Sequence, residues 1–208
     1  VRRNKITAED FEKIDDQARA LQKLPLFFDE SSGLSINQAT KKIRALHRKH
    51  PLRLVVVDYL QLMSGSKSRR NDSRVQDVTE ITVGLKGLAK ELGCPIIALS
   101  QLSRAVEQRD DKRPQLSDLR ESGSIEQDAD CVIFLFREEY YVQNQRPSKT
   151  ANAQAWTDWE IAMEAVKGRA ELIVAKNRHG AAGAVEVGFN AELMRFESEP
   201  PPAVEADD

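Results

Sequence analysis

Three short runs of apolar residues constrain the fold of this chain more than any other feature of its sequence. They are RLVVVD at 53–58, PIIALS at 95–100 and CVIFLF at 131–136. Continuous apolar runs of this length are typical of strands in parallel sheets, which are covered by helices on both faces. Residues 75–92 between the first two runs predict a helix that ends at Gly93. We therefore expect an α/β fold with a largely parallel central sheet flanked by helices.

Two further helices are predicted before the first strand. Residues 7–23 and 35–50 carry apolar residues at helical spacing, and Thr7 and Ser35 can each open a capping box. The other expected elements are a strand at 26–29, an insertion at about 143–169, strands at 170–175 and 184–189 that form a terminal β-hairpin, and an acidic disordered tail at 197–208.

Composition narrows the class of protein. The chain has 31 Lys and Arg against 33 Asp and Glu, so it is not a bulk polycation, although local basic patches can still bind nucleic acid. The longest apolar runs are too short to span a membrane. The two cysteines, Cys94 and Cys131, both lie in apolar runs. This placement predicts buried, reduced thiols in a cytoplasmic protein, and neither a disulfide scaffold nor a zinc site.

Polar residues that follow the predicted strands are the candidates for function, because ligands bind outside the carboxyl ends of parallel strands. Asp58 ends the first run, where a carboxylate can hold hydrated Mg²⁺ against nucleotide phosphates or can simply cap a turn. Gln101 follows the second run, where its amide can sense a phosphate or orient a water, or can be an ordinary exposed side chain.

The sequence AKNRHG places Lys176 and Arg178 at the tip of the predicted hairpin. Three interpretations are open for a basic tip. It can be a solvated surface, a phosphate contact, or an arginine finger that supplies charge to phosphoryl transfer in a neighbouring subunit.

The segment SDLRESGSIEQDAD at 117–130 combines Arg120 and Glu121 with the small residue Gly123. Small residues allow close approach of the backbone to a phosphate, and an adjacent arginine can pair with that phosphate. The alternative is the capped start of a helix with internal ion pairs. Basic residues at 67–74 and 104–113 are compatible with nucleic-acid binding or with a solvated surface.

Taken in order, four segments resemble the carboxy-terminal motor domain of bacterial replicative DNA helicases of the DnaB type. They are VVVDYLQLM, GCPIIALSQLSR, LSDLRESGSIEQDADCVIFLFREEYY and ELIVAKNRHGAAGAVEVGF, and the resemblance covers residues 5–196 apart from the insertion. It implies a RecA-like fold in an ATP-dependent DNA helicase. Members of this family form homo-hexameric rings that encircle single-stranded DNA and move 5′ to 3′ during DNA replication. The resemblance is also compatible with a primase and a helicase loader as partners.

The resemblance also implies a role for each candidate residue. Asp58 matches the Walker B aspartate, which holds Mg²⁺ through water, and Gln101 matches the glutamine that senses the phosphate of ATP. Arg178 matches the arginine finger, with Lys176 as its companion. The residues that match the DNA-binding loop of the ring's pore are Arg120, Glu121 and Gly123.

One family motif is missing from these residues. No G-x-x-x-x-G-K-[ST] Walker A loop occurs, because Gly84, Gly87 and Lys90 have the wrong spacing and fall in a predicted helix. The family's catalytic glutamate, which follows that loop, is missing too. In family order both would precede Val1, so the chain is expected to be the later part of a motor domain and to be inactive as an ATPase on its own.

Two other interpretations use the same motifs. A truncated member of the family could act only as a DNA-binding or interaction module without catalysis, which the missing Walker A loop favours. A RecA-type recombination or clock-type ATPase would share the Walker B aspartate at the end of a buried strand, but the RESGSIEQDAD segment argues against this assignment.

Overall fold

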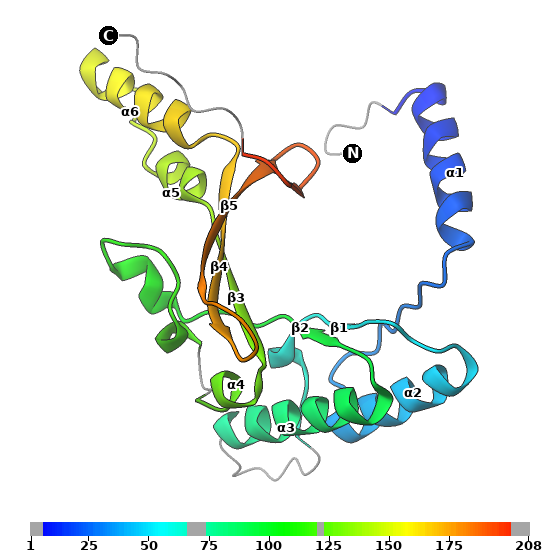
Figure 1. Ribbon diagram of the computed structural model, residues 1–208. Coiled ribbons are helices and arrows are strands. Elements are labelled where there is room, and N and C mark those ends of the chain that lie inside the picture. The colour runs from blue at the N-terminus through cyan, green and yellow to red at the C-terminus, as the bar shows by residue number, and fades with distance from the viewer. Residues whose placement is uncertain (1–5, 66–73, 120–122, 201–208) are drawn as a thin grey trace. The chain divides into compact units, whose positions relative to one another are not determined.

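The computed structural model describes residues 6–65, 74–119 and 123–200. The chain divides into two compact units, residues 1–32 and 33–208 (Figure 1). Within the described residues, no helix is both long enough and apolar enough to cross a bilayer.

The first unit contains helix α1, Ala8–Gln22. Thr7 caps it through the predicted capping box, in which the side chains of Thr7 and Asp10 each bind the other's backbone N–H. The strand predicted at 26–29 is wrong, since these residues adopt no regular structure. A strand is maintained by a hydrogen-bonded neighbour, and the described strands pair only within the two sheets of the second unit.

The second unit contains a two-stranded parallel sheet and a four-stranded antiparallel sheet. In the parallel sheet, Val55 pairs with Ile96 and Val57 with Ala98. The bounds of its strands and of the helices beside them are β1 Val55–Val57, β2 Ile96–Ala98, α2 Ile36–Lys49 and α3 Arg74–Leu92, with a short 3₁₀ turn at Leu60–Leu62 after β1.

The antiparallel sheet has the strand order β3-β4-β5-β6 (Figure 1). The predicted terminal hairpin is confirmed as the β4–β5 pair. The bounds are β3 Cys131–Phe136, β4 Arg169–Asn177, β5 Gly183–Asn190 and β6 Arg195–Glu197, and the helices of this part are α4 Gly123–Asp128, α5 Glu138–Asn144 and α6 Ala153–Val166, with 3₁₀ turns at Arg104–Gln108 and Leu116–Asp118.

The prediction of a largely parallel central sheet is therefore wrong for the described residues, although the α/β class holds. The run at 131–136 pairs with β4 in antiparallel fashion instead of joining β1 and β2. It buries Val132, Phe134 and Phe136 on one face and exposes the alternate residues on the other. Cys131 lies on the exposed face, so its predicted burial is also wrong, whereas Cys94 is buried.

The main core lies between α2, α3, α4 and β3. Val78 and Ile81 of α3 are fully buried in it. Gly84 of the same helix permits the close approach of α2, because a Cβ at this position would lie 2.5 Å from Cγ1 of Ile36. Gly84, which the sequence places in a helix and outside any phosphate loop, is thus needed for helix packing.

Residues between β3 and β4 form a helical hairpin of α5 and α6. Trp156 and Trp159 of α6 contact each other edge to face, and the Arg146 guanidinium lies over both rings. The indole N–H of Trp159 donates to the carbonyl of Val142 in α5 at 2.8 Å. These contacts pack the two helices against each other, in the region where the sequence predicts an insertion.

Candidate functional site

Asp58 and Gln101 follow neighbouring parallel strands and leave the sheet at the same edge. The ladder continues beyond both strands, since the backbone N–H of Leu60 donates to the carbonyl of Leu99 at 2.9 Å. The side chains of Asp58 and Gln101 are exposed, so both are accessible to a ligand. Parallel pairing of β1 and β2 thus places the chain segments that hold these two predicted residues at the same end of the sheet.

Gln61 links the two chain segments at this edge, and sequence reasoning did not identify it. Its side-chain amide donates to the hydroxyl of Ser100 at 3.0 Å, and its side-chain oxygen accepts from the backbone N–H of Gln101 at 3.2 Å. The backbone carbonyl of Gln61 accepts from Arg74 at 2.8 Å. A single glutamine inside the apolar stretch YLQLM gives no pattern that distinguishes this role in advance.

Asp58 fits a Mg²⁺ ion that is bound mainly by phosphate and water. Its carboxylate is exposed at the end of β1. In the described part of the chain, no three His, Cys, Asp or Glu side chains gather into a metal-binding group. Mg²⁺ at nucleotide sites commonly uses only one or two carboxylates besides phosphates and waters, so one such carboxylate is sufficient.

Lys176 and Arg178 lie at the end of β4, where both contact the C-terminal end of α4. The Lys176 ammonium donates to the carbonyls of Glu126 and Gln127 at 2.5 and 3.4 Å. Arg178 donates to the Gln127 carbonyl at 3.4 Å and to the Asp130 carboxylate at 3.1 Å. Carbonyls at a helix C-terminus lack partners within the helix and carry partial negative charge, so cations are favourable there.

The turn after Arg178 is shaped by Asn177. Its side-chain oxygen accepts from the backbone N–H of His179 at 3.2 Å. The Asn177 side chain also lies close to Gly180, because a Cβ built at Gly180 would be 2.5 Å from the Asn177 amide nitrogen. The two basic residues are therefore presented on an ordered tip.

The predicted DNA-binding residues fall mostly outside the described residues. Arg120 and Glu121 are not described, whereas Gly123 is the first residue of α4 and is exposed. On the other side, Leu119 forms an antiparallel bridge with Leu102. Leu102 directly follows Gln101, so the segment that holds the predicted DNA-binding residues begins next to the chain that leaves β2.

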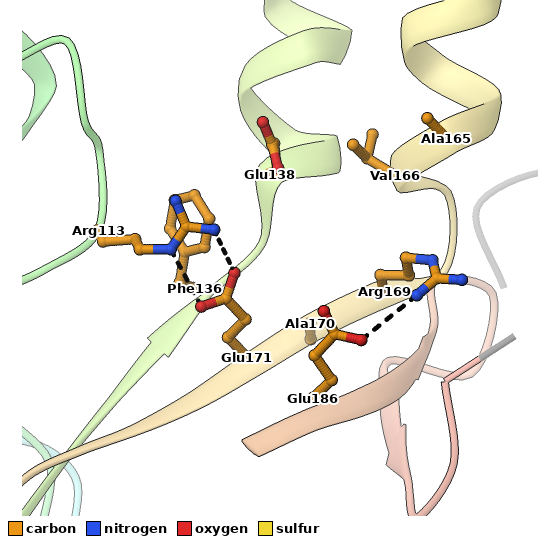
Figure 2. A pocket seen from close by; sticks show the side chains of 9 residues that line it. All are labelled: Arg113, Phe136, Glu138, Ala165, Val166, Arg169, Ala170, Glu171 and Glu186. Atoms are coloured by element: carbon orange, nitrogen blue, oxygen red, sulfur yellow. Dashed lines mark hydrogen bonds and ion pairs between the residues drawn. The ribbon is translucent and has the colours of Figure 1, made fainter. Parts of the chain in front are cut away.

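A cavity of about 320 Å³ lies apart from these candidate residues, between β3, β4, β5 and the ends of α5 and α6 (Figure 2). Arg113 lies over the ring of Phe136 and forms two hydrogen bonds with Glu171, at 2.6 and 3.1 Å, which raise the pKa of the guanidinium above its ordinary value. Arg169 pairs with Glu186 across the neighbouring strands at 3.4 Å. The arginines of this cavity thus already have carboxylate partners.

Comparison with known proteins identifies the family. The family described as DnaB-like helicase C-terminal domain matches residues 1–198. The chain is 44% identical over 198 residues to the replicative DNA helicase DnaB of Rickettsia bellii, and 41% identical over 196 residues to that of Geobacillus stearothermophilus. In each case the match covers 94% of this chain and 39% of the relative, so the chain spans about two fifths of their length.

Solved structures agree with the sequence comparison. A DnaB-like replicative helicase, solved with its interactions with primase, matches with a TM-score of 0.76 and 39% identity over 95% of this chain and 43% of that one. A second solved structure, of an ATPase domain, matches with a TM-score of 0.76 and 38% identity, over 95% of this chain and 63% of that one. The chain therefore belongs to the family of DnaB-like helicase C-terminal domains.

Proposed function

We propose that this chain is part of the ATP-driven motor of a replicative DNA helicase, which separates duplex DNA by moving 5′ to 3′ on one strand in a homo-hexameric ring. The observation that carries the proposal is the parallel pairing of β1 and β2, whose carboxyl ends lead into Asp58 and toward Gln101, in a chain of this family. Its substrates would be ATP and DNA, and its place of action the bacterial cytoplasm.

Each candidate residue has a distinct task in this proposal. Asp58 would hold Mg²⁺ through water, and the ion would neutralise phosphate charge. Gln101 would contact the terminal phosphate of ATP bound at the same edge, with Gln61 fixing its backbone. Arg178, assisted by Lys176, would contact nucleotide bound to the adjacent subunit. Charge neutralisation and positioning supply most of the catalysis in phosphoryl transfer.

The DNA site in this proposal is the segment that includes Arg120, Glu121 and Gly123. The Arg120 guanidinium would pair with a backbone phosphate of single-stranded DNA, and Gly123 would permit close approach of the strand. Phosphate contacts position DNA without reading its sequence, as a helicase requires. A primase and a helicase loader are proposed as partners, the first because the primase-associated helicase is among the similar structures.

The test is strand displacement by the protein expressed from its complete reading frame. We expect Mg²⁺- and ATP-dependent separation of a forked duplex with a 5′ single-stranded tail, and no separation by Asp58→Asn. The exposed Glu160→Gln on α6 is the matched control and should keep wild-type activity. Wild-type turnover in the Asp58→Asn protein would remove Asp58 from the metal site.

A non-catalytic role is the second candidate, because the 208 residues contain no Walker A loop. The 208-residue chain alone should not hydrolyse ATP measurably, since the loop that holds the phosphates is not among its residues. If the complete reading frame also yields a protein that binds DNA but neither binds nor hydrolyses ATP, the interaction module is the correct assignment.

A further inference from the structure

Asp130, between α4 and β3, makes two contacts with Arg178 at the hairpin tip and one with Lys86 of α3. Its carboxylate accepts a hydrogen bond from the Arg178 guanidinium at 3.1 Å and another from the Lys86 ammonium. Its backbone carbonyl accepts from the backbone N–H of Arg178 at 2.8 Å. One residue therefore binds both the main chain and the side chain of Arg178.

The two cations that bind the Asp130 carboxylate differ in their location and in their exposure to solvent. Lys86 belongs to α3, and its side chain is 22% exposed. Arg178 lies on the hairpin tip, and its side chain is 47% exposed. The Lys86 hydrogen bond, with the nearby charges of Arg178 and His179, holds the pKa of Asp130 below its ordinary value. Asp130 is therefore ionised at neutral pH and keeps a cationic partner if Arg178 leaves.

The contact of Arg178 with Asp130 competes with the role that the proposed function gives to Arg178. A guanidinium binds carboxylate and phosphate oxygens through the same N–H donors. When Arg178 donates to Asp130, fewer of its donors are available for a phosphate on the adjacent subunit. Because this ion pair is exposed to solvent, breaking it costs little.

We propose that Asp130 is a positioning residue that docks the Arg178 guanidinium until a nucleotide phosphate on a neighbouring copy of the chain withdraws it. Lys86 neutralises Asp130 after that withdrawal, and so lowers the free-energy cost of removing Arg178 from Asp130. The inference rests on the proposed function, because it requires Arg178 to contact nucleotide in trans. It adds a residue, Asp130, and a counter-ion, Lys86, that do not themselves touch the nucleotide.

The position of the hairpin tip does not depend on the Asp130 carboxylate alone. The backbone hydrogen bond from Arg178 to the Asp130 carbonyl, and the contacts of Lys176 with α4, remain when the carboxylate is changed to an amide. Asp130→Asn therefore weakens side-chain docking while preserving the shape of the tip. Lys86→Met strengthens side-chain docking, since Arg178 is then the remaining cation of the two that bind the Asp130 carboxylate.

The experiment measures ATP hydrolysis against ATP concentration for the protein expressed from its complete reading frame. We expect Asp130→Asn to lower the ATP concentration at half-maximal rate, and Lys86→Met to raise it, each by about two- to fivefold. The maximal rate should change less than about twofold. The double variant should resemble Asp130→Asn, because Lys86 acts only through the carboxylate, and Asp130→Glu should restore wild-type behaviour.

Opposite shifts from two changes at one ion cluster distinguish docking from a structural role. If both variants shift the half-maximal concentration in the same direction, or if neither shifts it, the docking role of Asp130 is wrong. Arg178→Ala separates this result from the fate of the proposed function. Wild-type turnover by Arg178→Ala overturns both proposals, whereas loss of turnover together with parallel or absent shifts overturns docking alone.

Discussion

The guanidinium of Arg109 holds the carboxylate of Asp118 through two hydrogen bonds, of 2.9 and 2.7 Å. Asp118 is almost fully buried and also accepts from the backbone N–H of Gln115 at 2.8 Å. The backbone carbonyl of Asp118 accepts from Ser103 at 2.8 Å, beside the bridge between Leu102 and Leu119. This pair therefore fixes the chain that leads into the predicted DNA-binding segment.

Asp118→Asn should destabilise the fold. The substitution removes the charge that strengthens the Arg109 hydrogen bonds and replaces one of the two acceptor oxygens with an NH₂ donor. Hydrogen bonds to charged groups contribute about 2 kcal/mol. We expect the free energy of unfolding in urea to fall by roughly that amount. The exposed Glu160→Gln should leave it unchanged, and an equal loss in both variants would show that Asp118 has no special role.

The same pair predicts a dependence of stability on pH. Burial raises the pKa of Asp118, but the hydrogen bonds from Arg109 and Gln115 and the Arg109 charge lower it more, so the pKa lies below its ordinary value. A carboxyl with a lowered pKa in the folded state stabilises that state above its unfolded pKa, about 3.9, and loses this contribution as the pH falls through the folded value. The difference in unfolding free energy between wild type and Asp118→Asn should therefore be full at about pH 7 and should shrink below about pH 4. A difference that stays constant from about pH 7 to about pH 3 would contradict this account.

The placement of Asp58 and Gln101 after two strands of a parallel pair could be predicted, because strand pairing follows from periodicity and connection. Two apolar runs separated by one helix must be parallel if they pair, and parallel neighbours end at the same edge. The capping boxes at Thr7 and Ser35 are predicted equally well, because each depends on residues three apart.

Contacts between distant residues could not be predicted in this way. An apolar run such as 131–136 does not reveal whether both of its faces are covered, so its antiparallel pairing with β4 and the exposure of Cys131 do not follow from the sequence pattern. The carbonyls that accept from Lys176 belong to residues about fifty positions away. Nothing in the local pattern of AKNRHG indicates that its cations bind a helix end.

Arg120→Ala should weaken binding of single-stranded DNA equally for unrelated sequences. Arg120 lies outside the described residues, so this prediction rests on the family resemblance and on the chemistry of phosphate contacts. Loss of one phosphate contact should make the slope of log affinity against log salt shallower by about 0.7 for a single strand. Fluorescence anisotropy with two labelled oligonucleotides at several salt concentrations measures both quantities. Unchanged affinity and slope would assign Arg120 to a structural role.

The trans role of Arg178 makes a prediction about mixed rings. Asp58 is proposed to act on nucleotide bound to its own subunit, and Arg178 on nucleotide bound to the next subunit. Every composite site then needs one functional residue from each of two copies. Asp58→Asn and Arg178→Ala proteins should each be inactive, the second with a loss of turnover on the order of 10³-fold, as for other arginine fingers.

Mixing the two should restore partial ATP hydrolysis, because some interfaces then join a subunit with intact Asp58 to a neighbour with intact Arg178. Residues that act within one subunit cannot complement each other like this, since every subunit in the mixture carries one of the two changes. Labelled subunits must show independently that mixed rings form, and mixed rings that remain as inactive as their parents would exclude the trans role.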